Sequence, residues 1–232
     1  MKPQFVFIYS ERHKIILVLV MLVFFAGLFF IIPTGDILHY PDESNYVRLA
    51  ESLIGKGAYL RIAGKLTAYK APGYPLLLSM VFHLWNSPMA AKIINAAALA
   101  GTAYLLALIA AEVIPEGSLF ASLLVLFYPV YFYTADTLYP QTLGAFLFSA
   151  VLFLLIRLPG SRLIYAISGF LFGLLVLMIP VFLLIFPILS TFIFIDKKGD
   201  KQCIWIPIFS SLLGFSSSPV REQFEMQSFT GS

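Results

Sequence analysis

The residues best suited to chemistry lie just after the first apolar run. Residues 40–46 read YPDESNY, and residues 69–75 read YKAPGYP. A carboxylate held at a membrane surface can act as a general base that takes a proton from an acceptor hydroxyl or amine. Asp42 is the candidate for that base, and Glu43 is its acidic neighbour.

Positive charge lies close by in the sequence. Lys70 and Arg61, with Lys65 as a further candidate, could neutralise the phosphate of a lipid leaving group. Each of these residues also has a simpler explanation. Two acids at the start of a helix complement its dipole, and basic residues in an interfacial loop commonly face anionic headgroups. The residues alone therefore leave both interpretations open.

Two helices are predicted to position these side chains. Residues 42–56 place apolar side chains at i, i+3, i+4, i+7 and i+8, which is one helical face, and two glycines end the segment. An amphipathic helix between two spans lies on the membrane surface. Residues 72–85 form an apolar stretch of 14 residues, too short to span and typical of an interfacial helix.

The composition is that of an integral membrane protein. Of the 232 residues, 60% are hydrophobic and only 12% are charged, and the mean hydropathy is +0.91. No basic stripe is present, which excludes a nucleic-acid partner. The single cysteine, Cys203, fits neither a disulfide framework nor a metal site. His39 lies near Asp36 and Asp42, but that spacing falls short of a ligand pattern, so a divalent metal is left open without support.

The predicted fold is an all-α bundle of about seven transmembrane helices. A crossing of about 30 Å needs about 20 apolar residues. The uncharged run from Leu163 to Ile195 is too long for one crossing, and Pro180 predicts a break within it. The candidate spans are residues 15–32, 89–113, 118–134, 138–156, 163–179, 180–195 and 203–217.

Charge predicts how this bundle is oriented. Residues 1–232 form one membrane domain, with an outer loop at 33–88, the remaining spans at 89–217 and an outer tail at 218–232. Short segments predicted to be cytoplasmic, together with the N-terminus, hold Lys2, Arg12, Lys14, Arg157, Arg162, Lys197, Lys198 and Lys201, eight of the 15 basic residues. This agrees with the positive-inside rule for a multi-pass protein of the cell membrane.

The motifs resemble those of GT-C glycosyltransferases over about residues 10–195. The similar elements are Pro-Asp-Glu-x-x-Tyr at residues 41–46, a helix ending in Gly, and Lys-x-Pro-Gly-Tyr at residues 70–74. The branch of protein O-mannosyltransferases and aminoarabinose transferases is the most similar. The resemblance implies a multi-span fold, a polyprenyl-phosphate sugar donor and transfer with inversion to an acceptor on the outer face. It implies that Asp42 is the base and Lys70 a phosphate contact, with Tyr46 and Tyr74 in the substrate pocket.

Two further positions depart from the family pattern. Relatives carry a second acid after a Tyr-Pro motif, whereas here Tyr139-Pro140 is followed by Gln141. Asp136 lies five residues earlier and either replaces that acid or is a solvated acid at the end of a span. Asp136 and Gln141 are both included in the predicted pocket. Residues 178–180 read MIP, without the basic residue that relatives carry before this proline.

The leading hypothesis is a glycosyltransferase module. Because relatives are longer, the chain is expected to be the N-terminal portion of a larger enzyme, either active or degenerate. The alternative is a non-catalytic membrane protein that binds or moves polyprenyl lipids. A small transporter is disfavoured, because the predicted spans are almost free of charged residues.

Overall fold

The structure is a computed structural model that describes residues 11–59, 70–114, 117–157 and 162–197. Within these residues it is helical and contains no strand. The chain divides into two compact units, residues 1–189 and 190–232. The site lies in the first unit. Arg61, the predicted span 203–217 and the predicted tail 218–232 fall outside the described residues.

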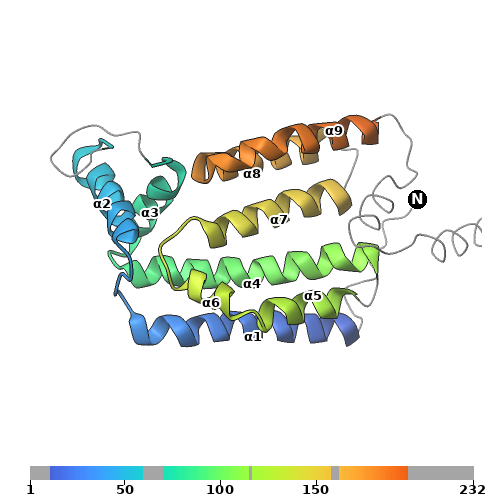
Figure 1. Cartoon of the computed structure of the whole chain (residues 1–232), viewed down its shortest axis with the longest axis horizontal. Helices are drawn as coiled ribbons and strands as arrows, with labels where there is room; N and C mark the ends of the chain where they lie inside the picture. The colour runs from blue at the N-terminus through green and yellow to red at the C-terminus, as the bar shows by residue number, and fades with distance from the viewer. Residues whose placement is uncertain (1–10, 60–69, 115–116, 158–161, 198–232) are drawn as a thin grey trace, which may run out of the picture. The chain divides into compact units, whose positions relative to one another are not determined.

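Helices of very different length follow one another along the described chain (Figure 1). Their bounds are α1 Glu11–Thr34, α2 Pro41–Lys56, α3 Gly73–Leu84, α4 Pro88–Val113, α5 Gly117–Leu126, α6 Pro129–Ala135, α7 Gln141–Arg157, α8 Arg162–Met178, the 3₁₀ helix η2 Pro180–Ile185 and α9 Phe186–Lys197.

The long helices of the first unit run side by side in alternating directions (Figure 1). Helix α4 packs against α1, α5 and α7, and α7 packs against α8. Helices α2 and α3 pack on each other at one end of this bundle. That end, here called the α2–α3 end, also holds the end of α1, the start of α4, the link from α6 to α7 and the end of α8.

Among the described residues, two helices, α1 and α4, are long and apolar enough to cross a membrane. The count rises to three if α5 and α6 form one bent span. The predicted span 118–134 is therefore a pair of helices bent by 60° rather than one straight helix. Pro129 is the cause, because proline lacks an N–H group and holds the preceding Tyr128 in an extended conformation. Helices α7 and α8 have 17 residues each and are apolar but shorter.

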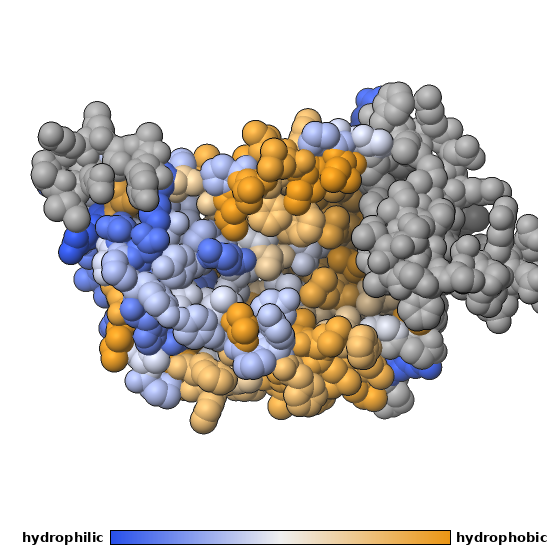
Figure 2. All heavy atoms as spheres, in the orientation of Figure 1, coloured by the Kyte–Doolittle hydropathy of each residue, from blue (hydrophilic) through white to orange (hydrophobic). Residues whose placement is uncertain are grey.

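The surface of these helices indicates association with a lipid bilayer. Helix α1 buries Ile16, Val23 and Ile31 and exposes large apolar side chains such as Phe25 and Phe29. Figure 2 shows hydrophobic residues gathered over the bundle helices and hydrophilic residues gathered over the α2–α3 end. Exposed apolar surface of this extent is stable only against lipid or another apolar surface.

Helices form at the two segments, 42–56 and 72–85, for which the sequence predicts them. Helix α2 begins with Pro41 at its first position and ends at Gly57, which adopts a left-handed conformation with φ of 60°. Helix α3 covers most of the predicted segment 72–85. The break in the long apolar run is also confirmed, because α8 ends at Met178 and Pro180 starts a 3₁₀ helix. Placement of α2 and α3 along a membrane surface stays a prediction.

Candidate functional site

The first turn of α2 separates two neighbouring acids. Successive residues of a helix point about 100° apart, so one of an adjacent pair can face outward while the other faces the core. The side chain of Asp42 is 49% exposed, whereas Glu43 is completely buried. The sequence predicts Asp42 as the base and Glu43 as its acidic neighbour in one catalytic site, and the structure gives the two side chains opposite environments.

Asp42 forms an ion pair with Lys70, the residue predicted to bind the donor phosphate. The Nζ atom of Lys70 lies 3.1 Å from Oδ1 of Asp42 and 4.8 Å from the ring centroid of Tyr46. A cation over an aromatic face is stabilised by the ring quadrupole, which helps to fix Lys70 in this place. The structure therefore brings together the Asp42 and Lys70 motifs, which are separated in the sequence by most of α2 and the segment that follows it.

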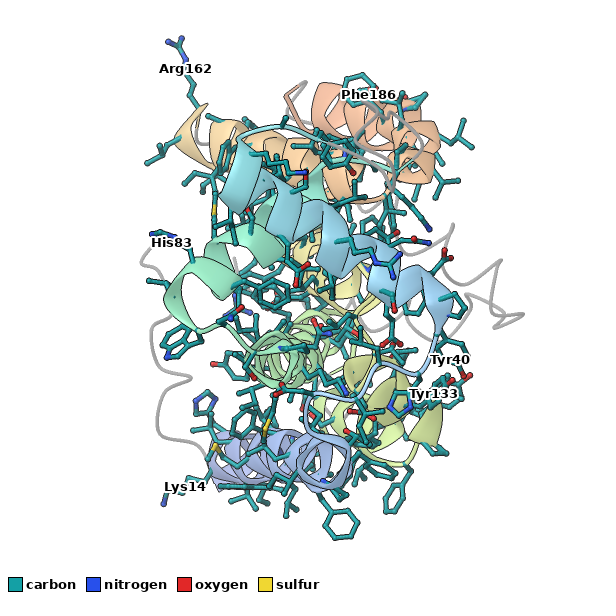
Figure 3. The ribbon with its side chains drawn as sticks, turned by 90° about the vertical axis from the view of Figure 1, so that its left-hand side faces the viewer. Lys14, Tyr40, His83, Tyr133, Arg162 and Phe186 are labelled. Atoms are coloured by element: carbon teal, nitrogen blue, oxygen red, sulfur yellow. The ribbon has the colours of Figure 1, made fainter. Side chains whose placement is uncertain are left out.

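An aromatic cluster joins the same two motifs to a third. The rings of Tyr46 and Tyr74 pack edge to face with centroids 5.1 Å apart, and Tyr139 lies 6.2 Å from Tyr46. Burial raises the pKa of the Tyr46 and Tyr74 hydroxyls. Figure 3 looks onto this end of the unit and shows Tyr40 and Tyr133 together at one edge, where their rings are 6.3 Å apart. The predicted pocket residues Tyr46 and Tyr74 thus lie beside the Asp42–Lys70 pair.

Glu43 lies beneath the surface that Asp42 occupies. Its Oε2 atom accepts a hydrogen bond of 3.1 Å from the backbone N–H of His39, and its Oε1 atom has no hydrogen-bond partner within the described part of the chain. Burial, the largest effect, raises the pKa of the Glu43 carboxyl. In this arrangement Glu43 cannot touch a substrate, so any effect on chemistry must act through its neighbours.

Asp136 lies at the centre of a polar cluster. Its Oδ1 atom accepts a bond of 2.6 Å from the Thr34 hydroxyl and lies 3.2 Å from Nζ of Lys92. Its Oδ2 atom is 3.0 Å from Nε2 of His39. The residue is 7% exposed, so the interpretation of Asp136 as a solvated acid is wrong. Gln141, in contrast, is exposed at the start of α7 and is not among the residues that bind Asp136.

Lys92 is the functional candidate that the sequence analysis missed. It is the fifth residue of α4 and is completely buried, and its Nζ atom also donates to the carbonyl of Ile37 at 2.7 Å. Lys92 is a charged residue within the predicted span 89–113, although the predicted spans hold very few charges. The signal was available, because a lysine inside an apolar span needs a partner and marks a site by default.

The close approach of two backbones explains one glycine of the second motif. A Cβ atom on Gly73 would lie 2.7 Å from the carbonyl carbon of Leu177, near the end of α8. Only glycine lets the start of α3 sit this close to α8.

The next residue, Tyr74, is buried with its hydroxyl facing Asn95, though without a hydrogen bond of regular geometry. Asn95 donates instead to the carbonyls of Ala135 and Thr137.

The acids and histidine that suggested a metal take separate partners. Asp36 accepts bonds from the Ser87 hydroxyl at 2.6 Å and the Met89 N–H at 2.8 Å, at the start of α4. These bonds, that of Ser87 first, lower the pKa of Asp36. Asp42 binds Lys70, and His39 binds Asp136. In the described ranges, no group of three or more His, Cys, Asp or Glu side chains is placed to hold a metal ion.

Comparisons of the chain with protein-family models, with curated proteins and with solved structures found no match.

Proposed function

We propose that this chain is a membrane glycosyltransferase module that transfers a sugar from a polyprenyl-phosphate donor to an acceptor on the outer face of the membrane. The observation that carries the proposal is the half-exposed Asp42 carboxylate, 3.1 Å from Lys70 and beside a cluster of tyrosine rings. A base, a phosphate-binding cation and flat apolar rings are the groups that such a transfer needs at one place.

The reaction follows from the roles of these groups. Asp42 takes the proton of the acceptor hydroxyl or amine as its oxygen or nitrogen forms a bond to the anomeric carbon. The bond from that carbon to the phosphate oxygen breaks, and the polyprenyl phosphate leaves with the electron pair. A single displacement inverts the anomeric carbon. Lys70 turns from Asp42 toward the phosphate, which neutralises the leaving group and releases Asp42 to act as the base.

The other predicted site residues take supporting places. The ring of Tyr46 lies against Lys70, and the buried ring of Tyr74 packs behind Tyr46 and holds it in place. Asp136 acts from beneath the surface through its neighbours, and Gln141 offers an exposed amide to a substrate. Arg61, as a second phosphate contact, remains a prediction from the sequence.

Seven spans with a cytoplasmic N-terminus complete the proposal. The alternating directions of the bundle helices put Arg12, Lys14, Arg157 and Arg162 at the end opposite α2 and α3. Glu112 forms an ion pair with Arg157 at that same end, which accounts for a link from α4 to α5 that lacks a basic residue. With basic residues inside, the α2–α3 end faces the outside of the membrane.

The direct test is a turnover assay on the chain in lipid nanodiscs with a defined polyprenyl-phosphate sugar and a panel of soluble and lipid acceptors. The expected result is release of polyprenyl phosphate together with a glycosylated acceptor of inverted configuration. Donor binding without any release would instead favour the alternative, a non-catalytic protein that binds polyprenyl lipids. A chain that neither binds the donor nor releases polyprenyl phosphate would contradict both functions.

A further inference from the structure

The link between α1 and α2, residues 35–40, is held by side chains from other parts of the chain. The carbonyl of Ile37 accepts a bond of 2.7 Å from Lys92, on α4. The ring of His39 lies 3.0 Å from Asp136, which follows α6. The backbone N–H of His39 donates to the side chain of Glu43, on α2. Two contacts from distant parts of the chain and one from α2 itself thus fix the residues that lead into the first turn of α2.

The pair formed by Lys92 and Asp136 is common to the first two of these contacts. Their Nζ and Oδ1 atoms are 3.2 Å apart, and the Thr34 hydroxyl fixes the same carboxylate oxygen. A pair of charges taken out of water adds little net stability, because desolvation offsets most of the attraction. The pair instead fixes positions: Lys92 and Asp136 hold each other in place, and each contacts the link. Removing one partner leaves the other buried and uncompensated.

We infer that the buried Lys92–Asp136 pair is a positioning device for transfer: it fixes residues 37–43 and thereby sets where the Asp42 carboxylate stands relative to Lys70. Lys92 and Asp136 are positioning residues and do not touch substrate. The kinetic part of this inference rests on the proposed function, whereas the clamp on the link stands without it.

Charge balance explains why the pair must act as a unit. In the described chain, the buried charged side chains are Glu43, Lys92 and Asp136, and the histidine that faces them is His39, whose side chain is 31% exposed. Lys92 is the cation in contact with Asp136, and its charge also acts on the nearby Glu43. Without Lys92, the Asp136 carboxylate is buried near Glu43 with no lysine in contact. Both acids contact the link through His39, so we expect the link to move in response.

The clamp can be tested without any enzymatic assay, by hydrogen exchange measured on the chain in nanodiscs. In Lys92→Met, amides of residues 36–44 should exchange at least about tenfold faster, because the link loses its bond to α4, while α7 keeps its protection. The double variant Lys92→Met with Asp136→Asn removes both charges but leaves an amide that can bind Thr34 and His39. It should recover the part of the protection that the uncompensated charge of Asp136 removes, while the bond from α4 to Ile37 stays lost. Lys56→Met, an exposed lysine at the end of α2, is the matched control and should change nothing.

Unchanged exchange of residues 36–44 in Lys92→Met would overturn the clamp, as would an equal loss of protection in α7, which would make the pair a general core contact. If the chain transfers sugar, kcat of Lys92→Met should fall at least about tenfold with little change in the KM for donor, and the double variant should recover part of it. A rise in KM alone would contradict positioning of the base while leaving the clamp intact. If the parent chain shows no transfer, the exchange experiment still decides the clamp, and only the proposed function fails.

Discussion

Two acids adjacent in the sequence carry different chemistry here because a helix turns them apart. Asp42 faces outward next to Lys70, and Glu43 faces inward with one oxygen that has no partner among the described residues. Burial favours the protonated form of the Glu43 carboxyl, whereas the Asp42 carboxylate is half-exposed and lies against a cation. The sequence predicts acids at this turn, but only the packing of the link above Glu43 distinguishes them.

The buried acid predicts a dependence of stability on pH. Burial raises the pKa of Glu43 from its ordinary value of 4.5. As the pH rises above 4.5, the unfolded chain loses this proton while the folded chain keeps it. The folded state therefore loses stability across the window from 4.5 up to the raised pKa, and no further above it. Thermal unfolding followed against pH should show this decline.

Glu43→Gln removes the titrating group and should flatten that part of the profile. Glu51→Gln changes an exposed acid of the same helix and should keep the decline. Profiles of equal slope for the parent chain and Glu43→Gln would show that Glu43 ionises normally in the folded state.

At the scale of elements, the site depends on how closely α3 approaches α8. A Cβ atom on Gly73 would meet the carbonyl carbon of Leu177 at 2.7 Å, and the backbone cannot move aside as a flexible side chain would. Gly73→Ala should therefore lower the free energy of unfolding by about 1–3 kcal/mol, as overpacking does in cores. Reversible unfolding in denaturing detergent would measure it.

Gly55 provides the control for that substitution. It lies in α2, and a Cβ atom there would meet nothing within 4 Å. Gly55→Ala should leave stability unchanged or raise it by up to about 1 kcal/mol, because alanine favours the helix. A Gly73→Ala chain as stable as Gly55→Ala would mean that α3 can separate from α8 without cost.

Local patterns predict the elements better than the contacts between them. Pro41 and Gly57 bound α2 within a residue or so of the predicted segment, because helix ends are encoded by nearby residues. The polar cluster is different, since Lys92 and Asp136 meet only after α4 and α6 have packed against the end of α1. Neither the pairing nor the burial of Asp136 follows from spacing along the chain.

At the scale of the whole molecule, the alternating helices predict a topology. A cysteine at Ser44, in the first turns of α2, should react with a membrane-impermeant thiol reagent in intact cells. A cysteine at Ser161, between α7 and α8, should react only after the membrane is opened. Both variants are made in a Cys203→Ser background so that only the new thiol is labelled. Labelling of residue 161 but not residue 44 in intact cells would reverse the orientation.

The central claim is that Asp42 is the base of a sugar transfer, and one substitution tests it most directly. Asp42→Asn keeps the size of the side chain and a hydrogen bond to Lys70 but removes the basicity. In the nanodisc assay with a polyprenyl-phosphate sugar, release of polyprenyl phosphate should fall by about 10²–10⁴-fold. Glu51→Gln, elsewhere on α2, should keep full activity. If the parent chain turns over its donor and the Asp42→Asn chain does so equally fast, Asp42 is not the base.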